Sequence, residues 1–136
     1  MNRKQLFEQL ERHEGLKLKP YTDTVGKLTI GVGRNLDDVG ISYGEAMLML
    51  SNDVETAELL LKRRFPIVKG LDETRYHVLV NMCFNLGINR LANFRKMWIA
   101  IEAQDWPKAA LEMLDSKWAK QVGNRAIELS NQMREG

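Results

Sequence analysis

The sequence contains little cysteine, proline or histidine: one cysteine, three prolines and two histidines among 136 residues. A single cysteine excludes an intramolecular disulfide bond, and we expect synthesis in a reducing compartment. Cys83 lies in an apolar helical run, where a small core residue is a better interpretation than a reactive nucleophile. His13 and His77 have no second histidine or cysteine at ligand spacing, so we expect neither a metal site nor a cofactor.

A strong charge of one sign and a long apolar segment are also missing. The formal net charge is +2 and is divided evenly, at about +1 in each half of the chain. A nucleic-acid partner would require a clustered basic face, so we expect none. No apolar run approaches the length of a membrane span, and the N-terminal MNRKQLFEQLER lacks the apolar core of a signal peptide. We therefore expect no membrane insertion.

The composition that remains is typical of a globular domain, with 44% hydrophobic and 28% charged residues. Helical periodicity predicts a first helix over residues 3–13 that ends at Gly15. Ser42 and Glu45 form an S-x-x-E capping box, which predicts a long helix over 43–64. Further helices are predicted beyond the helix breakers Pro66 and Gly70: from Asp72 to about Leu86, over 89–93 and 95–103, after Asp105, and over 116–120 and 124–133.

Residues 17–33 follow a different pattern, which alternates and turns. Leu16 and Leu18 alternate with lysines, and the segment Asp23–Gly26 is typical of a hairpin turn. Residues 28–30 then form the returning strand. The sequence therefore predicts an α+β protein that is mostly helical, with a small antiparallel sheet of two or three strands near the N-terminus.

Two carboxylates stand out because they fall on different predicted elements. Glu14 comes at the end of the first helix, and Asp23 follows nine residues later in the hairpin turn. Such a pair can face across a cleft, where one acid protonates a leaving group and the other activates a nucleophile. The spacing alone favours solvated surface acids, and Thr29, six residues after Asp23, would alone be interpreted as an ordinary strand threonine.

The order of the motifs along the chain favours a catalytic role for Glu14 and Asp23. The set resembles the phage-type, T4 lysozyme-like family of endolysins over nearly the whole chain. The resembling residues are Glu14-Gly15-Leu16, Tyr21, Asp23-Thr24, Gly26, Thr29-Ile30-Gly31-Val32-Gly33, Asn81-Met82, Phe84, Leu86-Gly87, Trp106, Ala109-Ala110, Ser116, Trp118 and Asn124-Arg125-Ala126.

The resemblance implies a lysozyme-like fold: a small β lobe over 14–42, a connecting helix over 43–65, and a helical lobe of 66–136 together with 1–13. It also implies hydrolysis of the β-1,4 bond between N-acetylmuramic acid and N-acetylglucosamine in peptidoglycan, for host cell lysis. In the family, Glu14 matches the general acid, Asp23 the carboxylate that activates a water, and Thr29 the hydroxyl that positions it. Inversion at the anomeric carbon is expected.

The resemblance further implies substrate-binding roles for Gly33, Phe84, Asn85 and Arg125. Arg125 matches an arginine that approaches the catalytic glutamate, although the alternative that Arg125 is an ordinary surface residue remains open. Phe84 matches a residue of the cleft but could equally belong to the core. Asn85 stands where the family has glutamine, and it keeps an amide able to bind a sugar N-acetyl group. Trp106 and Trp118 are better interpreted as core residues than as sugar platforms.

The chain departs from the family in two places. Arg34 stands where the family has a histidine that pairs with an aspartate of the long helix, and Asp53 occupies the matching place. We therefore hypothesise an ion pair between Arg34 and Asp53. The segment 34–41 is also much shorter than usual, which predicts a small lobe with fewer sugar subsites and a more open cleft.

Two other functions remain open from the sequence. A lytic transglycosylase of the same fold group keeps the acid without the water-holding residues, so Asp23 and Thr29 speak against it. A non-catalytic peptidoglycan-binding protein predicts the loss of a catalytic position, and none is lost. For the muramidase we expect a monomer that stays in the host cytoplasm until a phage holin opens a route to the wall.

Overall fold

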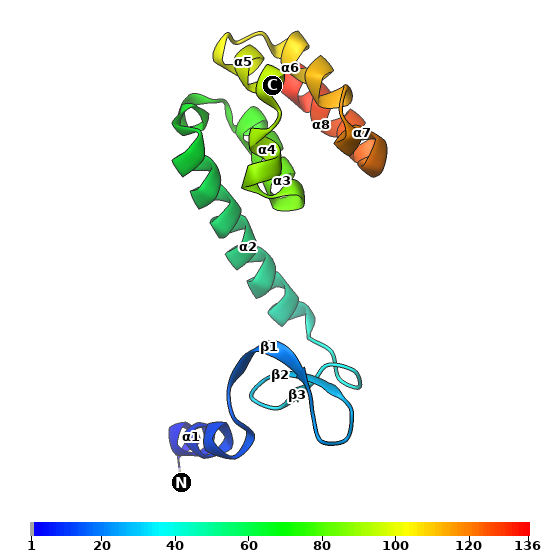
Figure 1. Ribbon diagram of the computed structural model, residues 1–136. Helices are drawn as coiled ribbons and strands as arrows, with labels where there is room; N and C mark the ends of the chain where they lie inside the picture. The colour runs from blue at the N-terminus through cyan, green and yellow to red at the C-terminus, as the bar shows by residue number, and fades with distance from the viewer. Residues whose placement is uncertain (1) are drawn as a thin grey trace. The chain divides into compact units, whose positions relative to one another are not determined.

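The computed structural model describes residues 2–136, which form two compact units (Figure 1). One unit ends at Met49 and the other runs Leu50–Gly136. The first contains one complete helix, a three-stranded sheet and the beginning of a second helix, and the second unit is helical within the described residues. The α+β class predicted from the sequence is confirmed. The assignment of residues 1–13 to a helical lobe stays a prediction.

Helix α1, Arg3–Glu14, is bounded by local signals. Asn2 and Gln5 form a capping box: each side chain accepts a hydrogen bond from the other residue's backbone N–H at 2.9 Å. Gly15 ends the helix with φ 79°, a conformation that favours glycine, and its N–H donates to the carbonyl of Glu11. Glu14 is therefore the last residue of the helix.

The sheet has the order β1-β2-β3, with both pairs antiparallel. Strand β1 covers Lys17–Thr22, β2 covers Leu28–Gly31, and β3 consists only of Arg34–Asn35. The turn between β1 and β2 is closed by a hydrogen bond from the Gly26 N–H to the Asp23 carbonyl at 3.1 Å, and Gly26 has φ 86°. The predicted hairpin is thus present.

Helix α2, Tyr43–Arg64, starts at the predicted capping box. The Ser42 hydroxyl accepts the Glu45 N–H at 3.1 Å, and the Glu45 carboxylate accepts the Ser42 N–H at 2.8 Å. Residues predicted only to end this helix, Pro66 and Gly70, instead bound a short 3-10 helix, η1 Pro66–Gly70. The local reason is that proline lacks an N–H but fits the first turn of a helix.

Beyond α2 and η1, the second unit consists of shorter helices whose beginnings were largely predicted. Asp72, Asp105 and Ser116 each accept a backbone N–H three residues on, at the starts of α3, α6 and α7. The helices are α3 Glu73–Leu86, α4 Ile88–Ala92, α5 Arg95–Glu102, α6 Trp106–Leu114, α7 Lys117–Val122 and α8 Asn124–Glu135. None of the helices within residues 2–136 is both long and apolar enough to cross a membrane.

The hydrophobic core lies in this second unit. Its fully buried large side chains are Leu61, Leu79, Met82, Leu91, Met97, Ile101, Met113 and Met133. Phe65 stacks on Trp98 with ring centroids 3.7 Å apart. Cys83 and Trp118 are each 3% exposed, and Trp106 packs partly buried against the core, as the sequence predicts. The burial of Cys83 raises the pKa of its thiol, which favours the unreactive protonated form.

Candidate active site

The Glu14 carboxylate lies directly against Gly33, in the turn between β2 and β3. A Cβ atom built on Gly33 would lie 2.9 Å from Glu14 Oε2, and Gly33 has φ 67°. The left-handed backbone favours glycine at this position, and a Cβ atom would fit only if the Glu14 carboxylate moved. The end of α1 and the β2–β3 turn therefore bring together two of the residues singled out from the sequence.

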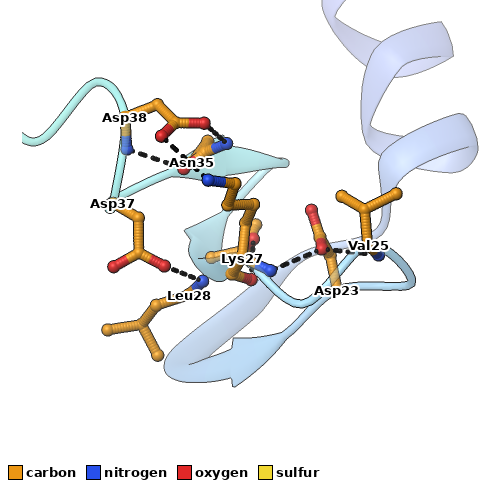
Figure 2. Close-up of polar contacts among 8 residues, drawn as sticks. Asp23, Val25, Lys27, Leu28, Asn35, Asp37 and Asp38 are labelled. Atoms are coloured by element: carbon orange, nitrogen blue, oxygen red, sulfur yellow. Dashed lines mark hydrogen bonds and ion pairs between the residues drawn. The ribbon is translucent and has the colours of Figure 1, made fainter.

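Asp23 is held at the β1–β2 turn by its own hairpin (Figure 2). Its Oδ1 accepts the backbone N–H groups of Val25 and Lys27, both at 2.9 Å, and its own N–H donates to the Lys27 carbonyl at 2.9 Å. Its other oxygen, Oδ2, has no hydrogen bond to any of residues 2–136. Oδ1 thus fixes the carboxylate, and Oδ2 can accept a proton or a hydrogen bond from a water.

Thr29 lies on β2 and is only 3% exposed. Its hydroxyl donates to the Lys27 carbonyl at 3.0 Å, the same oxygen that accepts the Asp23 N–H. Because its proton is committed to that carbonyl, the hydroxyl oxygen of Thr29 can only accept from a further partner. Asp23 and Thr29 are therefore neighbours that share one backbone oxygen.

The hypothesis that Arg34 pairs with Asp53 is wrong, because Glu45 binds the guanidinium instead. Arg34 Nη1 and Nη2 each lie 2.8 Å from a different Glu45 oxygen, and Nη1 also donates to the Gly40 carbonyl at 3.1 Å. Hydrogen bonding to Arg34 and to the Ser42 N–H lowers the pKa of Glu45 to about 2, and the same pair raises the pKa of Arg34. Glu45 therefore caps α2 and holds the β3 strand to it.

The remaining predicted site residues belong to the second unit. Phe84 is 44% exposed and lines a pocket of about 350 Å³ together with Arg125. Arg125 donates from Nε and Nη2 to Asn81 Oδ1, at 3.0 and 2.7 Å. Asn85 does not line this pocket. Its Oδ1 accepts the Trp118 indole N–H at 2.7 Å, which leaves its amide N–H groups available to donate to a ligand.

Sequence reasoning gave no role to Asn81, which fixes the Arg125 guanidinium. His77, Asn81 and Phe84 follow one another at i, i+4 and i+7 along α3, and all three line the same pocket. This helical spacing is the signal by which Asn81 could have been recognised in the sequence as a residue lining the pocket. The roles of Gly33, Phe84, Asn85 and Arg125 in binding a substrate stay predictions.

These residues belong to a chain of the phage lysozyme class. The profile of the family described as phage lysozyme matches residues 11–135. The chain therefore belongs to the T4 lysozyme-like family of lysozymes and endolysins.

Individual relatives agree with this assignment. The chain is 30% identical to the pre-baseplate central spike protein Gp5 of Enterobacteria phage T4, over 92% of this chain but only 27% of that protein. It is 29% identical to the probable T4-type lysozyme 1 of Dictyostelium discoideum, over 88% of this chain and 87% of the relative. An endolysin of Acyrthosiphon pisum secondary endosymbiont phage 1 is 27% identical over 82% of this chain and 75% of the relative.

The first two alignments extend over 153 and 148 positions, more than the 136 residues of this chain. The chain therefore lacks residues that both relatives contain. The location of that difference in the segment 34–41 stays a prediction.

Proposed function

We propose that the protein is a muramidase that hydrolyses the β-1,4 bond between N-acetylmuramic acid and N-acetylglucosamine in peptidoglycan, for host cell lysis. Family membership supports the substrate class, and the arrangement around the sheet supports the chemistry. The observation that carries the proposal is that Asp23 and Thr29 bind the same Lys27 carbonyl, while Asp23 Oδ2 has no hydrogen bond to residues 2–136 and the Thr29 hydroxyl can accept one. Both residues lie in the unit that also holds Glu14 against Gly33.

The proposed reaction needs one acid and one held water. Glu14 gives its proton to the glycosidic oxygen as the bond from that oxygen to the anomeric carbon breaks. A water donates one hydrogen to Asp23 Oδ2 and the other to Thr29 Oγ1, which directs a lone pair of the water toward the anomeric carbon. As the new carbon–oxygen bond forms, Asp23 takes the proton of the water.

Attack from the side opposite the leaving group inverts the anomeric configuration. An inverting pair of carboxyl groups stands roughly 6.5–9.5 Å apart, which leaves room for the water. In Asp23 one carboxylate oxygen stays bound to the turn, and the other is left to take the proton of the water.

A substrate-binding role is proposed for Gly33, Phe84, Asn85 and Arg125. The free amide of Asn85 can donate to the carbonyl of a sugar N-acetyl group. We further propose that the protein acts as a monomer and reaches the wall from the host cytoplasm by a holin-dependent route.

The alternative function is that of a lytic transglycosylase, which the proposed site can be tested against directly. It cleaves the same bond by an internal attack of the muramic acid and therefore needs no held water. The hydrogen bonds that fix Asp23 and leave Thr29 as an acceptor favour hydrolysis instead.

The test is digestion of purified peptidoglycan by the wild type, Glu14→Gln and Asp23→Asn, with mass analysis of the fragments. We expect reducing muramic acid ends from the wild type and a loss of at least about 100-fold in each variant, since a general acid or base contributes roughly that much. Glu11→Gln is the matched control, because Glu11 is an exposed acid on the same helix, three residues before Glu14. Anhydro-muramic ends would identify a transglycosylase, and an active Glu14→Gln would remove the proposed acid.

A further inference from the structure

The shortest strand of the sheet is completed by a side chain. The β2–β3 register pairs Thr29 with Asn35, so the next pair along the ladder is Leu28 with Leu36. One bond of that pair forms, from the Leu36 N–H to the Leu28 carbonyl at 2.8 Å. The Leu28 N–H, however, donates to the Asp37 carboxylate at 2.7 Å (Figure 2). Asp37 thus takes the place of a strand carbonyl where β3 ends.

The N–H bound by Asp37 belongs to the peptide group that joins Lys27 to Leu28. The oxygen of the same peptide group accepts the Asp23 N–H at 2.9 Å and the Thr29 hydroxyl at 3.0 Å. A peptide group is planar and rigid, so its two ends cannot move independently. The Lys27–Leu28 peptide group is therefore hydrogen-bonded to Asp23 and Thr29 through its oxygen and to Asp37 through its nitrogen.

We propose that Asp37 is a positioning residue for the hydrolytic reaction. By binding the Leu28 N–H it fixes the tilt of the Lys27–Leu28 peptide plane, and through that plane it sets the relative placement of Asp23 and Thr29. The inference rests on the proposed function, since it assigns Asp37 to the same site. A hydrogen bond from an N–H to an ionised carboxylate is short and strong, which suits this role at the exposed edge of a small sheet.

The neighbouring acid in the same loop lacks this connection. Asp38 binds the Lys27 ammonium at 3.2 Å, with side chains 55% and 43% exposed, and its other oxygen accepts the Asn35 amide at 2.9 Å. An exposed ion pair of this kind contributes little. Asp38→Asn therefore removes one negative charge from the loop without touching the peptide plane, and it is the matched control.

Steady-state kinetics on purified peptidoglycan test the role. In Asp37→Ala we expect kcat to fall on the order of 10- to 100-fold, because a small misplacement of a reacting group costs that much, while KM stays near the wild-type value. Asp37→Asn should recover most of the lost kcat, because its amide oxygen can still accept the Leu28 N–H. Asp38→Asn should retain wild-type kinetics. An unchanged kcat in Asp37→Ala, or an Asp37→Asn that is as slow as Asp37→Ala, would overturn the proposal.

Amide hydrogen exchange separates this proposal from the proposed function. Exchange of the Leu28 amide should be slow in the wild type and in Asp37→Asn, and at least about 10-fold faster in Asp37→Ala, because a lost hydrogen bond exposes the N–H to water. If Glu14→Gln proves as active as the wild type, the proposed function fails. If Asp37→Ala does not fold, the wild type and Asp37→Asn still test the proposal. Rapid exchange of the Leu28 amide in either protein would refute the positioning role of Asp37.

Discussion

A single added methyl group at Gly33 tests how the Glu14 carboxylate is placed. The new Cβ of Gly33→Ala would lie 2.9 Å from Glu14 Oε2 and 3.2 Å from the carboxyl carbon. Because these atoms form the far end of an exposed and flexible side chain, we expect the carboxylate to move aside and the backbone to stay. The substitution therefore displaces the proposed acid without removing it.

Two effects of Gly33→Ala have to be separated. Alanine in the left-handed conformation of Gly33, φ 67°, costs about 1–2 kcal/mol of stability. Displacing the acid should lower kcat on the order of 100-fold, as a misplacement of about 1 Å does. Gly40→Ala supplies the control, since Gly40 has φ 66° and no heavy atom within 4 Å of its added Cβ. It should lose the same stability and keep its kcat.

The comparison needs urea unfolding for stability and the release of reducing ends from purified peptidoglycan for activity. We expect equal unfolding free energies for the two variants and a large difference between their kcat values. A Gly33→Ala enzyme with wild-type kcat, or one no slower than Gly40→Ala, would refute the reasoning that the Glu14 contact matters.

Three further predictions concern stability and reactivity. The ionised Glu45 bound to Arg34 stabilises the fold fully above pH 4.5, and this contribution is lost as the pH falls toward about 2. Acid titration of unfolding should therefore show a flatter profile below pH 4.5 in Glu45→Gln, and an identical profile would contradict the pairing. Arg75→Ala removes two hydrogen bonds to backbone carbonyls at the end of α8, at 2.7 and 3.0 Å, and should lose about 2–3 kcal/mol in urea unfolding. A loss below about 0.5 kcal/mol would show that these bonds are dispensable. Burial, which raises the pKa of Cys83, should keep the thiol unreactive toward a disulfide reagent until urea unfolds the protein, and rapid labelling of the native state would contradict that burial.

Much of the fold follows from short-range signals that the sequence displays. The capping box of Ser42 and Glu45, the N-cap at Asp72 and the glycine at Gly87 each act within four residues, so the bounds of α2 and α3 could be predicted closely. The hairpin at Asp23 was equally local. Such interactions depend on neighbours in the sequence and need no knowledge of tertiary structure.

The hydrogen-bond partners that sequence analysis assigned wrongly or missed are those that depend on tertiary structure. Arg34 was assigned to Asp53 by position in the family pattern, yet Glu45 already stands at the start of α2, where the chain turns back toward β3. Eight residues of helix separate the two acids by about 12 Å, so only one of them can be reached. The bond of Asp37 to Leu28 was missed for the same reason, because it depends on where β3 stops.

The most direct measurement of the central claim is the fate of solvent oxygen during digestion of peptidoglycan in water enriched in oxygen-18. We expect one heavy oxygen at each new reducing muramic acid end from the wild type, and at least about 100-fold less of that product from Glu14→Gln or Asp23→Asn. Fragments that end in anhydro-muramic acid, with no heavy oxygen incorporated, would contradict the attack by a held water and the roles given to Asp23 and Thr29.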